Sequence, residues 1–185
     1  MRKLISYINI TPDGFCDHTA VLADEELHAS ANQLFRNADT GVFGRVTYQL
    51  MESYWPSVAQ NPTGIQSVDE FAVLLDNIEK IVFSRTMKSV EWQNARLATG
   101  GLEEEIVRLK KQPGKDMVVS SPSLISQLTR LELIDEYYFL VQPILAGSGK
   151  RFFETVELDK HHHLELTDTE VFTSGTIKLC YKKRG

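Results

Sequence analysis

Small polar and basic residues gather in four short clusters along the chain. In the loop Gly147–Lys150, two glycines let backbone N–H groups approach an anion closely, and the lysine adds a fixed positive charge. The other three clusters are Gly44–Thr47, Ser84–Thr86 and Ser120–Ser121. Two of these contain an arginine, Arg45 or Arg85, and guanidinium groups grip phosphate in a bidentate fork. The clusters therefore indicate a phosphorylated ligand; the alternative is that small residues close tight turns and the arginines are solvated.

Each cluster follows a segment that is typical of a strand. A continuous apolar run precedes Gly147–Lys150, as expected for a central strand of a covered sheet. Ligands of open α/β sheets bind beyond the carboxyl ends of the strands. Gly44–Thr47 and Ser120–Ser121 also open helices, whose N-terminal N–H groups and dipole favour anions. We therefore expect the four clusters to gather at one rim of a sheet.

Two further groups of residues could take part in chemistry. Trp55 could stack on a flat heterocycle, although large aromatic side chains usually fill gaps in a core or loop. The side chains of the adjacent His161–His163 cannot all point one way, and no cysteine or carboxylate joins them at ligand spacing. We therefore predict no metal site.

Strands alternate with helices along most of the chain. The expected strands are 4–10, 40–43, 80–83, 95–99, 117–119, 137–145, 163–172 and 176–182. The turn Thr11–Gly14 ends the first strand, and Thr173–Gly175 joins the last two into an antiparallel hairpin. This order predicts an α/β fold, with a mainly parallel central sheet, helices on both faces and a C-terminal antiparallel hairpin.

Capping residues mark where the helices between these strands begin. Asp24 is the expected N-cap of the first helix, and Ser67–Glu70 forms a capping box for a later one. Residues 56–66, between the helix that opens at Gly44 and this capping box, are expected to form a loop. Residues 102–111 form a helix supported by a Glu104–Arg108 pair, and Ser121 caps a final helix.

The bulk properties narrow the class of protein. The 185 residues fit a single domain, 1–185, and no segment is apolar enough to cross a bilayer. Lys and Arg number 20 against 25 Asp and Glu, and the net charge of −5 argues against nucleic acid or acidic membranes as partners. Cys16 and Cys180 make no disulfide framework, and the N-terminus lacks the apolar run of a signal peptide. We expect a soluble, cytoplasmic protein.

Four motifs in register resemble the dihydrofolate-reductase-like superfamily. They are Leu4–Phe15, Phe43–Tyr48, Val82–Thr86 and Pro143–Lys150, and they extend over nearly the whole chain. The Leu133–Tyr137 segment and the Pro-x-x-x-Gly-Ser-Gly-Lys-Arg-Phe pattern are most similar to the C-terminal reductase domain of the bifunctional riboflavin-biosynthesis deaminase–reductase and to its stand-alone bacterial relatives. The resemblance implies an NADPH-dependent oxidoreductase that is often a homodimer.

The resemblance also implies roles for individual residues. Gly44, Arg45 and Thr47 would hold the cofactor phosphates at a helix N-terminus. Ser84 and Arg85 would meet the 2′-phosphate of the adenosine, which favours NADPH over NADH. Asn9 and Ile10 would lie at the edge of the nicotinamide, and the turn at Asp13 would begin the loop over the nicotinamide. The pyrophosphate and the nicotinamide ribose would be lined by Ser120, Ser121, Gly147, Ser148 and Gly149.

The implied reaction is hydride transfer to a small nitrogen heterocycle, pterin-like or aminouracil-like, with Asp13 and Trp55 near the substrate. Such a transfer leaves negative charge that needs a proton, and Glu26 or His28 on the first helix could supply it. The alternative for Glu26 is that it only complements the helix dipole. Two alternatives to the enzyme stay open at this point: a non-catalytic, nucleotide-binding dimeric module of the same fold, and a purely structural dimer.

Overall fold

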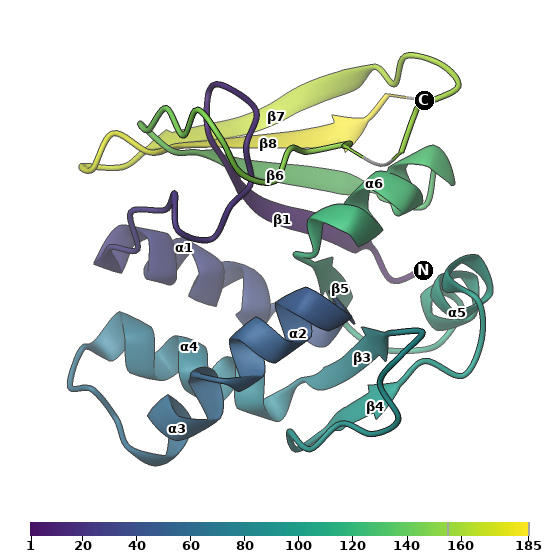
Figure 1. Cartoon of the computed structure of the whole chain (residues 1–185), viewed down its shortest axis with the longest axis horizontal. Helices are drawn as coiled ribbons and strands as arrows, with labels where there is room; N and C mark the ends of the chain where they lie inside the picture. Colours follow the sequence, from purple (N-terminus) through teal and green to yellow (C-terminus); the bar gives the residue numbers. More distant parts are fainter. Residues whose placement is uncertain (155, 185) are drawn as a thin grey trace.

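A computed structural model describes residues 1–154 and 156–184, and its centre is an eight-stranded sheet (Figure 1). The strand order is β4-β3-β2-β5-β1-β6-β8-β7. The strands are β1 (Leu4–Ile10), β2 (Ala38–Gly44), β3 (Glu79–Phe83), β4 (Ala95–Leu97), β5 (Asp116–Val119), β6 (Glu136–Val141), β7 (Leu164–Val171) and β8 (Ile177–Lys183).

The sheet is parallel from β4 to β6 and antiparallel beyond it. Each neighbouring pair from β4 through β6 is parallel, whereas β6 with β8 and β8 with β7 are antiparallel. The predicted fold class is therefore confirmed, including the C-terminal hairpin. Because the parallel strands run the same way, the residues that follow β3, β2, β5, β1 and β6 meet at one edge of the sheet.

Helices cover both faces of the sheet (Figure 1). The helices are α1 (Glu25–Arg36), α2 (Arg45–Glu52), α3 (Trp55–Gln60), α4 (Gln66–Asn77), α5 (Leu102–Lys110) and α6 (Pro122–Arg130). The alternation of side chains along β1 separates two cores: Ile5 packs with the side chains of α1 and α4, and Leu4 and Ile8 pack with those of α5 and α6. Among the described residues, no helix has the length and apolar character needed to span a membrane.

Local signals predicted some helix starts correctly and one wrongly. Asp24 caps α1 as expected, because its Oδ1 accepts the N–H of Leu27 at 2.8 Å. The Ser67–Glu70 capping box does not form, since α4 begins at Gln66 and Ser67 lies inside its first turn. The carboxylate of Asp69 instead accepts the N–H groups of Thr63 and Gly64, at 2.7 and 2.9 Å. Among the described residues no side chain caps α4, and the Asp69 carboxylate holds the turn that precedes the helix.

Three other expectations need correction. The expected 56–66 loop contains the short helix α3, which begins at Trp55 and has proline in its first turn. The strand expected over 137–145 ends at Val141, because Pro143 has no N–H to continue the ladder. In α5, Arg108 pairs with Glu105 at 2.7 Å rather than with Glu104. Glu105 is buried and also accepts Arg96 at 2.7 Å, so the tertiary partner decides which glutamate forms the pair.

Gly41 lies in the centre of β2, where a larger residue should destabilise the fold. A Cβ atom added there would lie 2.5 Å from Cε2 of Phe43 and 3.1 Å from Cδ1 of Ile78. We expect Gly41→Ala to lower the free energy of unfolding by about 1–3 kcal/mol, the usual cost of overpacking a core. Chemical denaturation measures this, with Gly44→Ala as the control because a Cβ there meets its neighbours only at 3.6 Å. Equal stability of the two variants would contradict the prediction.

Candidate active site

A cavity of about 570 Å³ opens at the carboxyl ends of β1, β2 and β5. Its walls are mostly apolar and come from the segment between β1 and α1, from α1 and α2, and from α4. The apolar lining includes Val21, Ala23, Leu27, Ala31, Phe35, Phe43, Val46, Leu50, Met51 and Phe71. The polar lining includes Asn9, Asp17, His18, His28, Thr47, Ser120 and Lys150. Such a cavity suits a flat, largely apolar ligand held by a few polar groups.

His28 lines this cavity from the first turn of α1 and is only 8% exposed. Its Nδ1 is 2.8 Å from the carbonyl oxygen of Asp24. A carbonyl can only accept, so Nδ1 carries a hydrogen and donates it. Among the residues that the structure describes, no group forms a hydrogen bond with Nε2. Nε2 is therefore the atom of His28 that remains for a ligand in the cavity.

Trp55 and Phe71 form an aromatic wall beside His28. The ring of Trp55 meets that of Phe71 edge-on at 4.7 Å between centroids, and meets His28 at 5.9 Å. These edge-to-face contacts fix both the indole and the imidazole in place. The structure therefore brings the predicted substrate residue Trp55 and the predicted catalytic residue His28 to the same cavity.

Glu26 lies outside the cavity, in contrast to the expectation from sequence. Its side chain is exposed, and its Oε2 accepts the backbone N–H of Thr173 at 2.6 Å. Side chains two positions apart in an α-helix, such as Glu26 and His28, point in directions about 200° apart around the helix axis, so they cannot face the same side. Glu26 thus contacts the turn of the C-terminal hairpin, and His28 is the candidate acid that reaches the cavity.

The residues at the ends of β2 and β5 hold each other in place. Gly44 donates its N–H to Oγ of the buried Ser121 at 2.8 Å, so this hydroxyl is already engaged as an acceptor. Gly44 is the N-cap of α2, and no side chain of the described residues caps this helix. Thr47 and Ser120 both line the cavity. The first N–H groups of α2 therefore face the cavity side of the rim without a capping side chain.

Two arginines lie farther along the same rim. Arg45 is exposed at the start of α2, and its guanidinium donates to Oε1 of Gln49 at 3.1 Å. Ser84 and Arg85 follow β3, the strand next to β2. Oγ of Ser84 accepts the N–H groups of Thr86 and Met87, at 3.1 and 2.9 Å, which fixes the turn and leaves Arg85 exposed.

The loop Gly147–Gly149 folds against the turn after β1. Asp13 accepts the N–H of Gly147 at 2.8 Å and that of Ala146 at 3.3 Å. Hydrogen bonds from Thr11 and Gly147 lower the pKa of the Asp13 carboxyl. Asp13 therefore ties two loops together and is absent from the cavity lining, and its place beside the substrate stays a prediction. In the same loop, Gly147 and Gly149 have φ of 68° and 121°, and Ser148 between them is exposed.

Comparison with known proteins agrees with this architecture. The family model described as the RibD C-terminal domain matches residues 2–178. The chain belongs to the RibD C-terminal domain family. The uncharacterized protein YyaP of Bacillus subtilis (strain 168) is 28% identical over 188 residues, which cover 100% of this chain and 96% of YyaP.

Two solved structures show that this RibD C-terminal domain has a fold in common with reductases. One is the Thermotoga maritima diaminohydroxyphosphoribosylaminopyrimidine deaminase/5-amino-6-(5-phosphoribosylamino)uracil reductase, with a TM-score of 0.68 and 15% identity. The match covers 99% of this chain and 57% of that chain. The other is Enterococcus faecalis dihydrofolate reductase complexed with NADP(H), with a TM-score of 0.60 and 14% identity over 99% of this chain and 97% of that chain.

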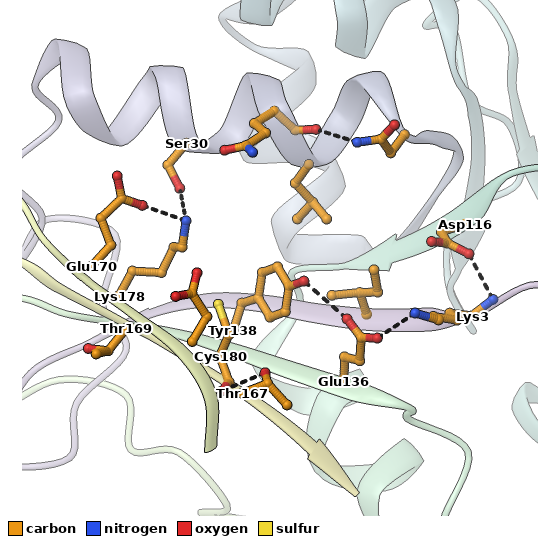
Figure 2. Close-up of a pocket in the computed structure, with 15 residues that line it drawn as sticks. Lys3, Ser30, Asp116, Glu136, Tyr138, Thr167, Thr169, Glu170, Lys178 and Cys180 are labelled. Atoms are coloured by element: carbon orange, nitrogen blue, oxygen red, sulfur yellow. Dashed lines mark hydrogen bonds and ion pairs between the residues drawn. The ribbon is translucent and has the colours of Figure 1, made fainter. Parts of the chain in front are cut away.

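A second cavity, of about 690 Å³, lies between α1 and the strands β6, β8 and β7 of this RibD C-terminal domain (Figure 2). Four of its six charged side chains form two ion pairs. Lys178 contacts Glu170 at 2.6 Å, and Lys3 contacts Glu136 at 2.7 Å. Burial raises the pKa of Cys180 in its wall to about 11, so this thiol is neutral near pH 7. With its two lysines already paired and Asp116 and Asp168 adding negative charge, this cavity is less suited to an anionic ligand than the strand-end rim.

Sequence reasoning missed one residue that lines the first cavity and one that lies behind it. Phe71 enters its wall from α4, which packs along α1, and no local pattern indicates this contact between helices. Gln142 lies behind the cavity and hydrogen-bonds Asn9 at 2.8 Å. In the sequence, Gln142 is a polar residue between an apolar run and Pro143, and this position could have indicated a buried polar contact. Ile10, predicted beside the nicotinamide, is absent from the lining; its carbonyl accepts the N–H of Gln142 at 2.9 Å.

Proposed function

We propose that this protein is an NADPH-dependent reductase that transfers hydride to a planar nitrogen heterocycle, pterin-like or aminouracil-like. The observation that carries this proposal is the continuity of two features at one edge of the sheet. The apolar cavity with His28 opens at the ends of β1, β2 and β5, and the basic and small residues continue from there to the end of β3. An extended ligand with a flat head and phosphates would occupy both.

The strand-end rim is suited to a phosphorylated cofactor. The uncapped N–H groups at the start of α2 favour an anion, and Arg45 and Arg85 are exposed along the same edge. Arg85 would contact the 2′-phosphate of the adenosine, with the hydroxyl of Ser84 beside it. The dihydrofolate reductase of similar fold is complexed with NADP(H), which supports this choice of cofactor.

The cavity accounts for the substrate end of the reaction. When bound, the reduced nicotinamide supplies the hydride. Trp55 offers a flat, rigid face, and apolar side chains around it exclude water from the reacting atoms. His28 holds its Nδ1 hydrogen on the carbonyl of Asp24, so a protonated imidazole presents Nε2–H to the cavity. We propose that Nε2 of His28 donates the proton that the substrate takes up after hydride transfer.

An affinity measurement on Arg85→Ala tests the proposal. Hydrogen bonds to charged groups contribute about 1.5–3 kcal/mol, so we expect NADPH to bind about 10- to 100-fold more weakly and NADH to bind as before. Isothermal titration calorimetry gives both constants. Arg130→Ala is the matched control, because α6 starts at the carboxyl end of β5 and carries the exposed Arg130 back to the opposite edge.

The outcomes separate the candidate functions. Loss of NADPH affinity in Arg85→Ala alone, together with oxidation of NADPH in a screen of pterins and aminouracils, supports the reductase. Binding without oxidation of any of these compounds supports the nucleotide-binding module. No binding of either nucleotide to the wild type contradicts both. The homodimer that the resemblance implies stays a prediction, which analytical ultracentrifugation measures directly.

A further inference from the structure

We infer that the buried side chain of Gln142 holds Asn9 as a hydrogen-bond donor in the cavity, so that the ligand must present a hydrogen-bond acceptor, such as a carbonyl oxygen, to it. The identity of that ligand rests on the proposed function, whereas the orientation of the two amides does not. Gln142 follows β6 and is fully buried. Asn9, near the end of the neighbouring strand β1, lines the cavity.

A backbone donor determines the orientation of the Gln142 amide. The N–H of Leu22 lies 3.0 Å from one terminal atom of Gln142. A backbone N–H can only donate, so this atom must be the acceptor Oε1. The hydroxyl of Thr176, also fully buried, lies 3.3 Å from the same oxygen and can donate to it as well. The other terminal atom of Gln142 is therefore Nε2, a donor.

The orientation of Asn9 follows from that of Gln142. Nε2 of Gln142 lies 2.8 Å from the terminal atom of Asn9, which must accept and is therefore Oδ1. Nδ2 is the opposite branch of the same planar group. Within residues 1–154 and 156–184, no group accepts a hydrogen bond from Nδ2, and Asn9 is partly exposed and lines the cavity. The series of hydrogen bonds from Leu22 through Gln142 to Asn9 thus leaves the NH₂ group of Asn9 for the ligand.

This polarity selects one class of ligand group. A carbonyl oxygen accepts from Nδ2, whereas an exocyclic amine at the same point would place two donors against each other. Two parts of the proposed complex carry such an oxygen: the carboxamide of the nicotinamide and a ring carbonyl of an aminouracil or pterin. Sites built to hydrogen-bond one polar group discriminate strongly against an analogue that lacks it.

Gln142 also ties down the segment that covers the cavity. Leu22 belongs to the connection between β1 and α1, which contributes Asp17, His18, Val21 and Ala23 to the lining. One buried amide therefore joins the covering segment, the end of β1 and the C-terminal hairpin. Gln142 touches no part of the cavity itself, so it is a positioning residue rather than a catalytic one.

Two substitutions reverse the polarity that the ligand meets. Asn9→Asp keeps the shape and still accepts from Gln142, but it presents an oxygen where Nδ2 was. When its carboxyl is ionised, Gln142→Glu still accepts from Leu22 and has no donor for Asn9, so the Asn9 amide must turn over and present Oδ1 to the cavity. Thr176→Val is the control, since it removes the hydroxyl contact and leaves the Leu22 contact that determines the orientation.

Calorimetry with two probes, NADPH and 5-aminouracil, measures the effect on binding. We expect one probe to lose affinity by about tenfold in both Asn9→Asp and Gln142→Glu, as for a lost hydrogen bond of about 1–1.5 kcal/mol, and to keep it in Thr176→Val. Loss for NADPH identifies the carboxamide as the acceptor, and loss for 5-aminouracil identifies a ring carbonyl. Unchanged affinity of both probes in both variants would overturn the inference.

A second measurement needs no ligand. In ¹⁵N-labelled wild-type protein, we expect the Nε2 protons of Gln142 to be protected from solvent exchange and the Nδ2 protons of Asn9 to exchange freely. In Gln142→Glu, the Asn9 protons should become protected. The opposite pattern in the wild type would overturn the orientation for any ligand. If neither probe binds the wild type while this pattern holds, the proposed function fails and the orientation of Asn9 is upheld.

Discussion

Replacing His28 with glutamine is expected to lower turnover about 10²- to 10³-fold while leaving NADPH affinity in place. General acid catalysis by a positioned side chain contributes typically 10²–10⁴-fold, and the glutamine amide has no proton to give up at neutral pH. His28 lines the cavity, whereas the proposed phosphate contacts lie along the rim toward β3. The loss should therefore appear in kcat and not in the dissociation constant of the cofactor.

Steady-state kinetics on the first compound that the wild type reduces gives this comparison. His161→Gln is the matched control, because His161 is exposed in the connection before β7 and should leave turnover unchanged. Turnover of His28→Gln within about threefold of the wild type would mean that His28 supplies none of the 10²-fold or more expected of a positioned acid, and that the proton comes from another group or from water.

Replacing Lys80 with methionine is expected to lower the free energy of unfolding by about 3 kcal/mol or more. Lys80 is fully buried at the start of β3 and donates to the carbonyls of Leu75, Asp76 and Ile78, at 2.7, 3.1 and 2.9 Å. These carbonyls end α4, where a cation also complements the helix dipole. Methionine fills similar space but leaves these buried acceptors without a donor, which costs about 1–3 kcal/mol for each group left unsatisfied.

The same lysine makes stability depend on pH. Burial lowers the pKa of Lys80 from its ordinary 10.5 to about 8. Between these two values the unfolded chain binds more protons than the folded one, so the free energy of unfolding should rise as pH increases from about 8 to about 10.5. Below pH 8 both states are protonated and this contribution is constant. The rise should be absent in Lys80→Met.

Urea denaturation across this pH range measures both effects. Lys88→Met, at an exposed position after β3, is the control and should change stability by no more than about 0.5 kcal/mol. A decrease in the free energy of unfolding of less than about 1 kcal/mol in Lys80→Met would contradict the role of the three carbonyl contacts, because even one buried unsatisfied group costs about 1–3 kcal/mol. The same rise with pH in the variant as in the wild type would contradict the assignment to Lys80.

Much of the fold could be predicted because its determinants are local. The extent of β1, the turn with Gly14 at φ 87° and the hairpin turn at Gly175 follow from residues adjacent in sequence. The errors occur where a distant or competing partner decides. Asp69 binds the turn before α4, and the helix begins before Ser67. Arg96 on β4 pairs with Glu105, which makes Glu105 rather than Glu104 the partner of Arg108.

The candidate site could be predicted as a location but not as a set of contacts. Parallel strands bring Gly44, Arg85 and Ser120 to one edge, which the strand order alone implies. The sequence could not distinguish Glu26 from His28, because both lie in the first turn of α1 and its rotation is determined by packing against α4. The hydrogen bond from Gln142 to Asn9 depends on the pairing of β1 with β6, which local periodicity does not reveal.

A crystal structure of the protein with bound NADP⁺ tests the central claim most directly. We expect the nicotinamide in the cavity with His28 and Asn9, the pyrophosphate at the start of α2, and the 2′-phosphate within hydrogen-bonding distance of Arg85. A nucleotide bound instead in the cavity between α1 and the C-terminal hairpin (Figure 2), or an arrangement with the adenosine away from β3, would contradict the proposed site.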